Sequence, residues 1–163
     1  MISAISTGST REICAGSTDT LSASAECLRH PNAIAGLSDG GAHVGFISDG
    51  SFPTFLLSYW ARDAKEAVFP VQEMIRRLTS DTARAAGLHD RGVLRAGMKA
   101  DLNVIDFAAL KLNAPRMVRD LPAGGRRLLQ KPDGYIATIM NGEVTYRDGV
   151  ATGALPGRLL RSA

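Results

Sequence analysis

The sequence predicts an α/β protein with helices in its first half and strands mainly in its last third. A short apolar segment at 34–37 precedes two longer segments whose apolar residues recur with helical spacing. The last third contains alternating segments on either side of an Asn-Gly pair, which is typical of a β-hairpin. We therefore expect a loop or disordered segment at 1–21, a helical region at 22–92 and a β-rich region at 93–163.

The chain before the first long helix is expected to hold a loop, a short helix and a strand. Residues 1–20 are rich in Ser, Thr, Gly and Ala and show no periodicity. A helix is predicted from Ser22 to His30, with Ser22 as its N-cap. It should end before Pro31, because the residue that precedes a proline avoids the helical region. The apolar segment 34–37 is then predicted to be a buried strand.

A longer amphipathic helix follows, with Ser51 as its N-cap. Its apolar stripe is expected to face the core and not a ligand. We expect Tyr59 and Trp60 to be at least half buried, and Arg62 and Lys65 to lie outside. The complete stripe is Phe52, Phe55, Leu56, Tyr59 and Trp60.

A second set of apolar residues repeats the helical spacing further along the chain. The polar residues at 79–81 are predicted to end this helix and to cap a shorter one at 82–86, which Gly87 closes. The apolar set comprises Val71, Met74, Ile75 and Leu78.

The β-rich region is predicted from alternation and turn residues. A strand is expected at 101–106, and a hairpin is expected from strands at 135–140 and 144–146 around the turn at 141–143. The segment 113–132 contains three prolines and a Gly-Gly pair, so it is predicted to be a long surface connection.

The composition is that of a soluble globular protein. Hydrophobic residues make up 45% of its 163 residues, and no apolar run is long enough to cross a bilayer. The chain has two cysteines and lacks a basic and apolar secretory signal at its start, so a cytoplasmic location is expected. The set Cys14, Cys27, His30 and His43 lacks the close pairs that structural zinc sites use.

Nucleic acid and membrane are not expected partners. The net charge is +3, but the cations are scattered, and aromatic residues make up only 6% of the chain. A small basic binding surface is the alternative, although a solvated surface is the simpler interpretation. Its best candidates are Arg116, Arg119, Arg126, Arg127 and Lys131.

The strongest functional signal is the carboxylate of Asp39, which follows the predicted strand and precedes two glycines, Gly40 and Gly41. An acid at the carboxyl end of a buried parallel strand is where barrel enzymes keep their chemistry. The glycines allow the backbone to approach a ligand closely. His43 either contacts the substrate, supports Asp39 or has no catalytic role. The alternative for the whole segment is an ordinary turn of Ser, Asp and Gly.

Three blocks of sequence together carry a family resemblance: GLSDGGAHV, LTSDTARAAGLHDRGVLRAGMKADLNVID and IATIMNGEVTYRDG. With them the chain resembles the C-terminal part of the amidohydrolase superfamily, nearest to the N-acyl-D-amino-acid deacylases. The resemblance implies the end of a TIM barrel, its last strand and following helices, over 22–92. It further implies part of a small β-sandwich domain over 93–163.

The resemblance implies a metal-dependent hydrolase of non-peptide C–N (amide) bonds with zinc as its cofactor. Asp39 would be metal ligand and general base, and His43, Gly40 and Gly41 would contact the substrate or support the acid. The substrate would be a small acylated amino acid or a related amide. A catalytically inactive fragment or an association module is the alternative.

Two features of that family have no counterpart in this sequence. The family's His-x-His pair, bridging anionic ligand and two later histidines all precede its aspartate block, and none is present here. One copy therefore cannot complete a metal site, so a homo-oligomer or a missing N-terminal barrel part is expected to supply it. The family's carboxylate-binding arginine is also missing from 44–55, and Arg62 lies further along.

Overall fold

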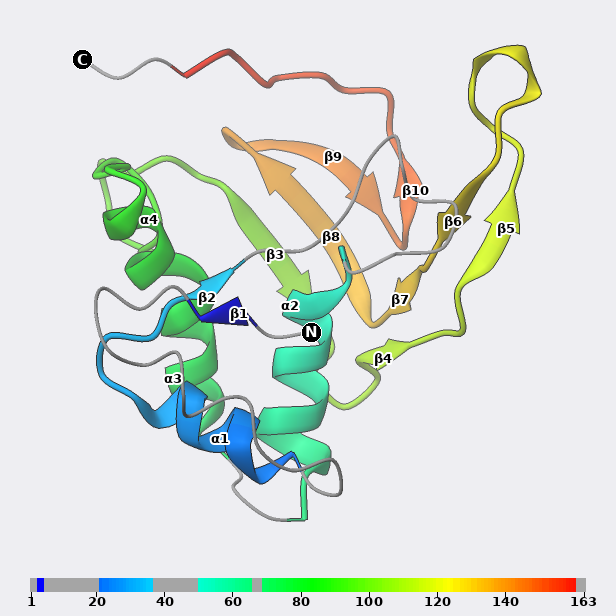
Figure 1. The fold of residues 1–163 in the computed structure, drawn as a ribbon. Coiled ribbons are helices and arrows are strands. Elements are labelled where there is room, and N and C mark those ends of the chain that lie inside the picture. The colour runs from blue at the N-terminus through cyan, green and yellow to red at the C-terminus, as the bar shows by residue number, and fades with distance from the viewer. Residues whose placement is uncertain (1–2, 5–20, 37–49, 66–68, 161–163) are drawn as a thin grey trace.

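The computed structural model describes residues 3–4, 21–36, 50–65 and 69–160. Its helices gather on one side of the molecule, and most of its strands lie on the other (Figure 1). The described part of the chain is therefore a mixed α/β structure, as the sequence predicts.

The first helix, α1, spans Ser22–Arg29 and ends as predicted. His30 has an extended backbone with ψ 130°, which agrees with the proline that follows. The prediction of Ser22 as N-cap is wrong, because Leu21 holds that position and no side chain caps the helix. The Leu21 carbonyl accepts the first helical hydrogen bond, from Ala25 at 3.0 Å.

The second helix begins where the sequence predicts. Ser51 is the N-cap residue of α2, Phe52–Phe55, which continues without interruption as the π-helical segment Leu56–Asp63. We call these two segments together helix 52–63. The π-helical part ends with a hydrogen bond of 2.8 Å from the Ala64 N–H to the Tyr59 carbonyl.

The apolar stripe of helix 52–63 lies in the core, which confirms the prediction. Leu56 and Trp60 are each only 2% exposed. The ring of Tyr59, which is partly buried, stacks on Phe55 with centroids 4.9 Å apart. Trp60 meets Phe69 edge to face at 6.0 Å.

The third helical region has no break at 79–81, so that prediction is wrong. Helix α3 (Val71–Arg76), the π-helical turn Arg77–Asp81 and α4 (Thr82–Ala85) are continuous. The hydroxyls of Thr79 and Ser80 donate to carbonyls one turn earlier, so the helix accommodates these polar residues. Gly87 has φ +72° and follows the helix, as predicted.

A four-stranded antiparallel sheet with the order β10-β9-β8-β3 forms the centre of the β-rich part. Asn141 and Gly142 both have positive φ, 52° and 83°, and form the predicted two-residue hairpin turn. The predicted strand and hairpin are thereby confirmed. The strands are β3 (Leu102–Ile105), β8 (Tyr135–Met140), β9 (Glu143–Arg147) and β10 (Val150–Ala151).

The predicted connection at 113–132 lies at the surface, as expected, but it contains two strands that pair with each other, so the expectation of a segment without strands is wrong. They form a ribbon that extends away from the helices (Figure 1). Pro132 begins a strand, a position at which its missing N–H is tolerated. The pairs are β4 (Lys111–Leu112) with β7 (Pro132–Asp133) and β5 (Arg116–Val118) with β6 (Arg127–Leu129).

The strand that leads toward Asp39 is β2, Ala35–Gly36, and Ala35 is buried. It pairs antiparallel with β1, Ser3–Ala4, so the expected parallel strand is wrong for the described residues. The expectation of a loop over 1–21 also fails at Ser3–Ala4, since this segment runs opposite to β2 and supplies its neighbour. Residue 37, the end of the predicted strand, lies outside the described residues.

One hydrophobic core extends across the helical and β-rich parts. Trp60 and Met74 from the helices and Leu110 from the β-rich part belong to it, and Leu110 is completely buried. Ile105 and Tyr135 pack against this core. The boundary between 92 and 93 stays a prediction. In the described part of the chain, no helix has both the length and the apolar character needed to cross a membrane.

Candidate functional site

The four residues predicted for the site, Asp39, Gly40, Gly41 and His43, lie outside the described residues. The structure does describe both flanks of that segment. Strand β2 leads into it and ends at Gly36, and helix 52–63 begins directly after it. The contacts of these flanks are therefore the described geometry that lies nearest to the predicted site in the sequence.

Polar contacts with the β-rich part hold the first turn of helix 52–63. The Ser51 hydroxyl donates to the Gln130 side-chain carbonyl, and the Gln130 amide donates to the Asn113 carbonyl at 2.8 Å. The hydroxyls of Thr54 and Tyr135 are hydrogen bonded at 2.9 Å. These contacts fix the start of the helix from residues far along the chain.

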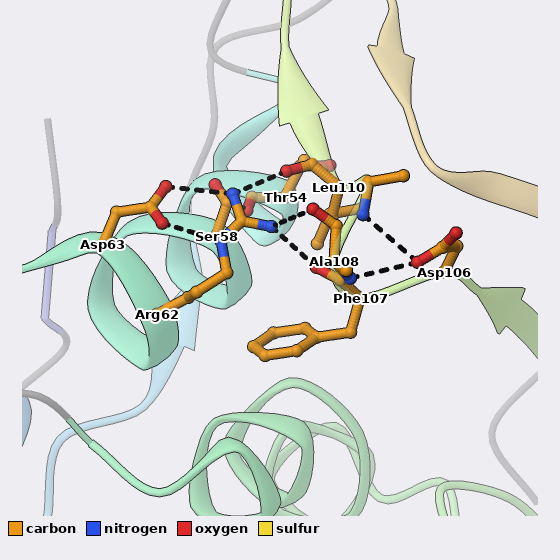
Figure 2. Close-up of polar contacts among 9 residues, drawn as sticks. Thr54, Ser58, Arg62, Asp63, Asp106, Phe107, Ala108 and Leu110 are labelled. Carbon is orange, nitrogen blue, oxygen red and sulfur yellow. Dashed lines mark hydrogen bonds and ion pairs between the residues drawn. The ribbon is translucent and has the colours of Figure 1, made fainter.

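Arg62 holds the other end of helix 52–63, as Figure 2 shows. Its Nη1 donates to the carbonyls of Phe107 at 2.6 Å and Ala108 at 3.1 Å. Its Nη2 donates to the Leu110 carbonyl at 2.8 Å and to Asp63 Oδ2 at 2.9 Å. Its Nε donates to Asp63 Oδ1 at 2.7 Å. The prediction that Arg62 lies outside is wrong, because its side chain is only 28% exposed and contacts the β-rich part.

The turn that receives Arg62 is organised by Asp106. Its Oδ1 accepts the N–H groups of Ala108 and Ala109, each at 3.1 Å (Figure 2). Such a side-chain-stabilised turn fixes where the neighbouring carbonyls lie. The Asp106 N–H itself donates to the Gly134 carbonyl at 2.8 Å, which attaches the turn to the start of β8.

The ion pairs shift the acidity of three surface carboxylates. The hydrogen bond from Arg62 lowers the pKa of Asp63 below its ordinary value of 3.8. Arg91 and Arg127 do the same for the pKa values of Asp90 and Asp120. A carboxylate with a lowered pKa in the folded state stabilises the fold above its ordinary pKa and loses that contribution as the pH falls below it. The pairs therefore favour folding at neutral pH and weaken in acid.

A second polar junction, at Asp101, joins the second and third of the sequence blocks that carry the family resemblance. Its Oδ2 pairs with Arg91 at 2.9 Å, and its Oδ1 accepts the Asn141 N–H at 2.8 Å. The Gly142 N–H donates to the Ala100 carbonyl at 3.0 Å. Asp101 thus holds the hairpin turn against the loop that leaves the helices. Its role here is structural.

The described ranges 3–4, 21–36, 50–65 and 69–160 include candidate metal ligands, among them His30 and His89. No group of three or more His, Cys, Asp or Glu in these ranges is placed to hold a metal ion. His30 accepts the Asn32 N–H at its Nδ1, 3.2 Å away, and His89 is exposed. Cys14 and His43, which the discounted zinc set would need, lie outside the described residues.

Several contact residues carried no signal in the sequence. Gln130 and Tyr135 bind helix 52–63 through polar side chains that no sequence motif marks. Arg77 is only 7% exposed, although a charged residue is expected at the surface. Its Nε and Nη2 donate to Glu73 Oε1 at 3.0 and 2.8 Å, and the spacing of four residues is the one signal that suggests this pair.

A search against family models matches residues 9–146 to the amidohydrolase family. The chain belongs to this family. It is also similar to the D-aminoacylase of Alcaligenes xylosoxydans xylosoxydans, with 32% identity over 111 residues. Those residues are 68% of this chain and 20% of the relative, so the chain spans about a fifth of that amidohydrolase's length. No solved structure gives a significant match to this amidohydrolase chain.

Proposed function

We propose that this chain is the C-terminal part of a metal-dependent hydrolase of non-peptide C–N (amide) bonds, similar to N-acyl-D-amino-acid deacylases. The observation that carries the proposal is its similarity to a D-aminoacylase over 111 residues. Membership of the amidohydrolase family supports the same class of reaction. Within this proposal, residues 22–92 correspond to the end of a TIM barrel and 93–163 to part of a small β-sandwich domain.

In this proposal Asp39 binds the metal and acts as the general base. A carboxylate in that place takes a proton from the attacking water and passes it to the leaving amine. The metal, which we propose to be zinc, makes its bound water more acidic. His43, Gly40 and Gly41 would contact the substrate or support Asp39. We propose that a second copy or an N-terminal barrel part supplies the other ligands.

The proposed substrate is a small acylated amino acid or a related amide. An acylated amino acid carries a carboxylate, which a cationic side chain can bind. Arg62, the first arginine after Asp39 in the sequence, has all its donors engaged by Asp63 and backbone carbonyls. The group that binds the substrate carboxylate is therefore a different residue.

The chain offers a matched pair of aspartates to test Asp39. Ser38-Asp39-Gly40 and Ser48-Asp49-Gly50 have the same local sequence, so both suit a turn equally well. We would replace the matching segment of the D-aminoacylase with this chain and compare Asp39→Asn with Asp49→Asn. For Asp39→Asn we expect a loss of about 10²–10⁴-fold in kcat/KM with little change in Tm. Equal activity of the two variants, or a loss of stability alone, would identify Asp39 as a turn residue.

Exposed leucines favour one second candidate, a non-catalytic association module. Leu94, Leu155 and Leu159 are 87%, 93% and 78% exposed. Apolar surface of this kind favours association with another copy or with a missing barrel part. Elemental analysis together with light scattering on the purified chain separates the candidates. Stoichiometric zinc in a defined oligomer supports the hydrolase, whereas a metal-free oligomer supports the association module.

A further inference from the structure

We propose that the free edge of β3 is a docking surface for the same edge of a second copy of this chain, so that two four-stranded sheets join into one across a twofold axis. In the described part of the chain, β3 pairs only with β8. It lies at one edge of the sheet, and β10 lies at the other (Figure 1). The proposal concerns association and does not depend on the reaction.

The backbone of Asn103 has hydrogen-bonding groups that point away from the sheet. On the side of β8, the Ala100 carbonyl accepts the Gly142 N–H at 3.0 Å, and the Asp106 N–H donates to the Gly134 carbonyl at 2.8 Å. Successive residues of a strand direct these groups to opposite sides. Asn103 lies three positions from both Ala100 and Asp106, so its N–H and carbonyl face outward. No other described segment bonds to them.

The two edges of the sheet differ in how well they are protected against a further strand. Strand β10 has only two residues, and so short an edge strand is a poor template for pairing. Strand β3 has four residues and contains no lysine, arginine or proline, which commonly protect an edge. Asn103 is exposed, and Val104 is 44% exposed. Of the two edges, β3 is therefore the one that a further strand can join.

The residues of β3 are complementary to those of an antiparallel copy. With the twofold axis at Asn103, Leu102 of each copy lies opposite Val104 of the other. These two apolar pairs share one face of the sheet, because residues two positions apart point to the same side. Asp101 of each copy lies opposite Ile105 of the other, so no carboxylate faces a carboxylate.

The carboxylates on either side of β3 are already bound within the chain. Asp101 is held by Arg91 and by the Asn141 N–H, and Asp106 is held by two N–H groups of its own turn. A partner chosen by its charge would need free charged groups at this edge, and β3 itself has none. The edge therefore suits its own copy better than an acidic or a basic partner.

An Asn103→Asp variant tests the contact without disturbing the sheet. The Asn103 Oδ1 accepts the Thr138 hydroxyl at 3.0 Å, and an aspartate keeps that acceptor. In the paired strands, however, it would place two carboxylates opposite each other on the axis, with Cα atoms about 5.5 Å apart. Light scattering over a dilution series should show a wild-type dimer, and a dimer at least about tenfold weaker in Asn103→Asp.

The matched control is Asn32→Asp, which makes the same change of charge at an exposed position in the loop after α1. It should dimerise as the wild type does, and circular dichroism should show the same secondary structure in all three proteins. A wild-type chain that stays monomeric would overturn the proposal. An association of equal strength in Asn103→Asp and Asn32→Asp would also overturn it, and would assign the contact to another surface such as the exposed leucines.

Amide exchange at low and high protein concentration locates the contact. The Asn103 amide should exchange at least about tenfold more slowly at high concentration, because pairing gives its N–H an acceptor. The Leu102 N–H, which points toward β8, should show no such dependence. A dimer in which exchange at Asn103 is independent of concentration would contradict the proposal. Both measurements are made without substrate, so their outcome is independent of the proposed hydrolase.

Discussion

At the scale of single residues, two glycines with similar backbone conformations differ in how closely another part of the backbone approaches them. Gly134 has φ +92°, and a Cβ there would lie 2.7 Å from Leu110 Cα and 2.8 Å from Leu110 N. Gly153 has nearly the same φ, +91°, but nothing within 4 Å. Both glycines look alike in the sequence, and the difference between them belongs to the tertiary structure.

These two glycines give a matched prediction. Gly153→Ala should cost about 1 kcal/mol in free energy of unfolding, from the positive φ alone. Gly134→Ala should cost roughly 1–3 kcal/mol more, because the added carbon collides with backbone that cannot rotate away. Chemical denaturation of the two variants measures the difference. Equal losses of unfolding free energy in the two variants would mean that the backbone at Leu110 moves to accommodate the new methyl group.

At the scale of elements, the regular helix and strand patterns were predictable from the sequence. The structure of the segments that connect them was not. The stripe of helix 52–63 and the Asn-Gly hairpin follow from spacing and turn residues, and the structure confirms both. The ribbon of β5 and β6 was predicted as a loop because prolines and glycines dominate its ends. The continuous helix across 79–81 was missed because Thr79 and Ser80 bond to the helix backbone and do not cap a new helix.

Asp101 gives a prediction at this scale, because it joins the hairpin turn to the loop after the helices. Asp101→Ala should cost about 1–3 kcal/mol, since the Asn141 N–H loses its acceptor and Arg91 keeps only Asp90 as a partner. Asp101→Asn keeps an acceptor for the Asn141 N–H and should cost less than about 1 kcal/mol, because the Arg91 pair is partly exposed.

The control for Asp101 is Glu143→Ala, at an exposed position beside the same turn. Thermal unfolding should show little change in that variant. If Asp101→Ala is no less stable than Glu143→Ala, the junction at Asp101 contributes nothing to the hairpin.

At the scale of the whole molecule, the shared core makes the helical and β-rich parts one cooperative unit. Leu110 lies in the β-rich part yet is completely buried in the cluster that contains Trp60. Trp60 is the chain's single tryptophan, so its fluorescence reports on the core around helix 52–63. Far-UV circular dichroism reports on all the secondary structure.

We predict one unfolding transition that both probes detect at the same temperature. Leu110→Ala should lower it for both probes by about 2–5 kcal/mol in free energy, through the cavity that it leaves. Leu94→Ala, at a position 87% exposed, should stay within roughly 0.5 kcal/mol of the wild type. Two separate transitions, with Trp60 insensitive to Leu110→Ala, would mean that the parts fold independently.

The sequence by itself determined the class of fold, most helix positions, strands β3, β8 and β9 with their hairpin, and the membership of the amidohydrolase family. Each of these depends on local spacing or on short blocks of residues, which a single chain displays directly. It also singled out Asp39 as the candidate site residue, and that assignment stays a prediction.

Only the tertiary structure decided what Arg62, Gln130, Asp101 and Leu110 do. Arg62 was expected at the surface because it follows the apolar stripe, yet its acceptors come from a turn 45 to 48 positions later. The local sequence pattern does not predict which distant carbonyl groups a side chain will contact. Those contacts exist only once helix 52–63 and the β-rich part have packed on their common core.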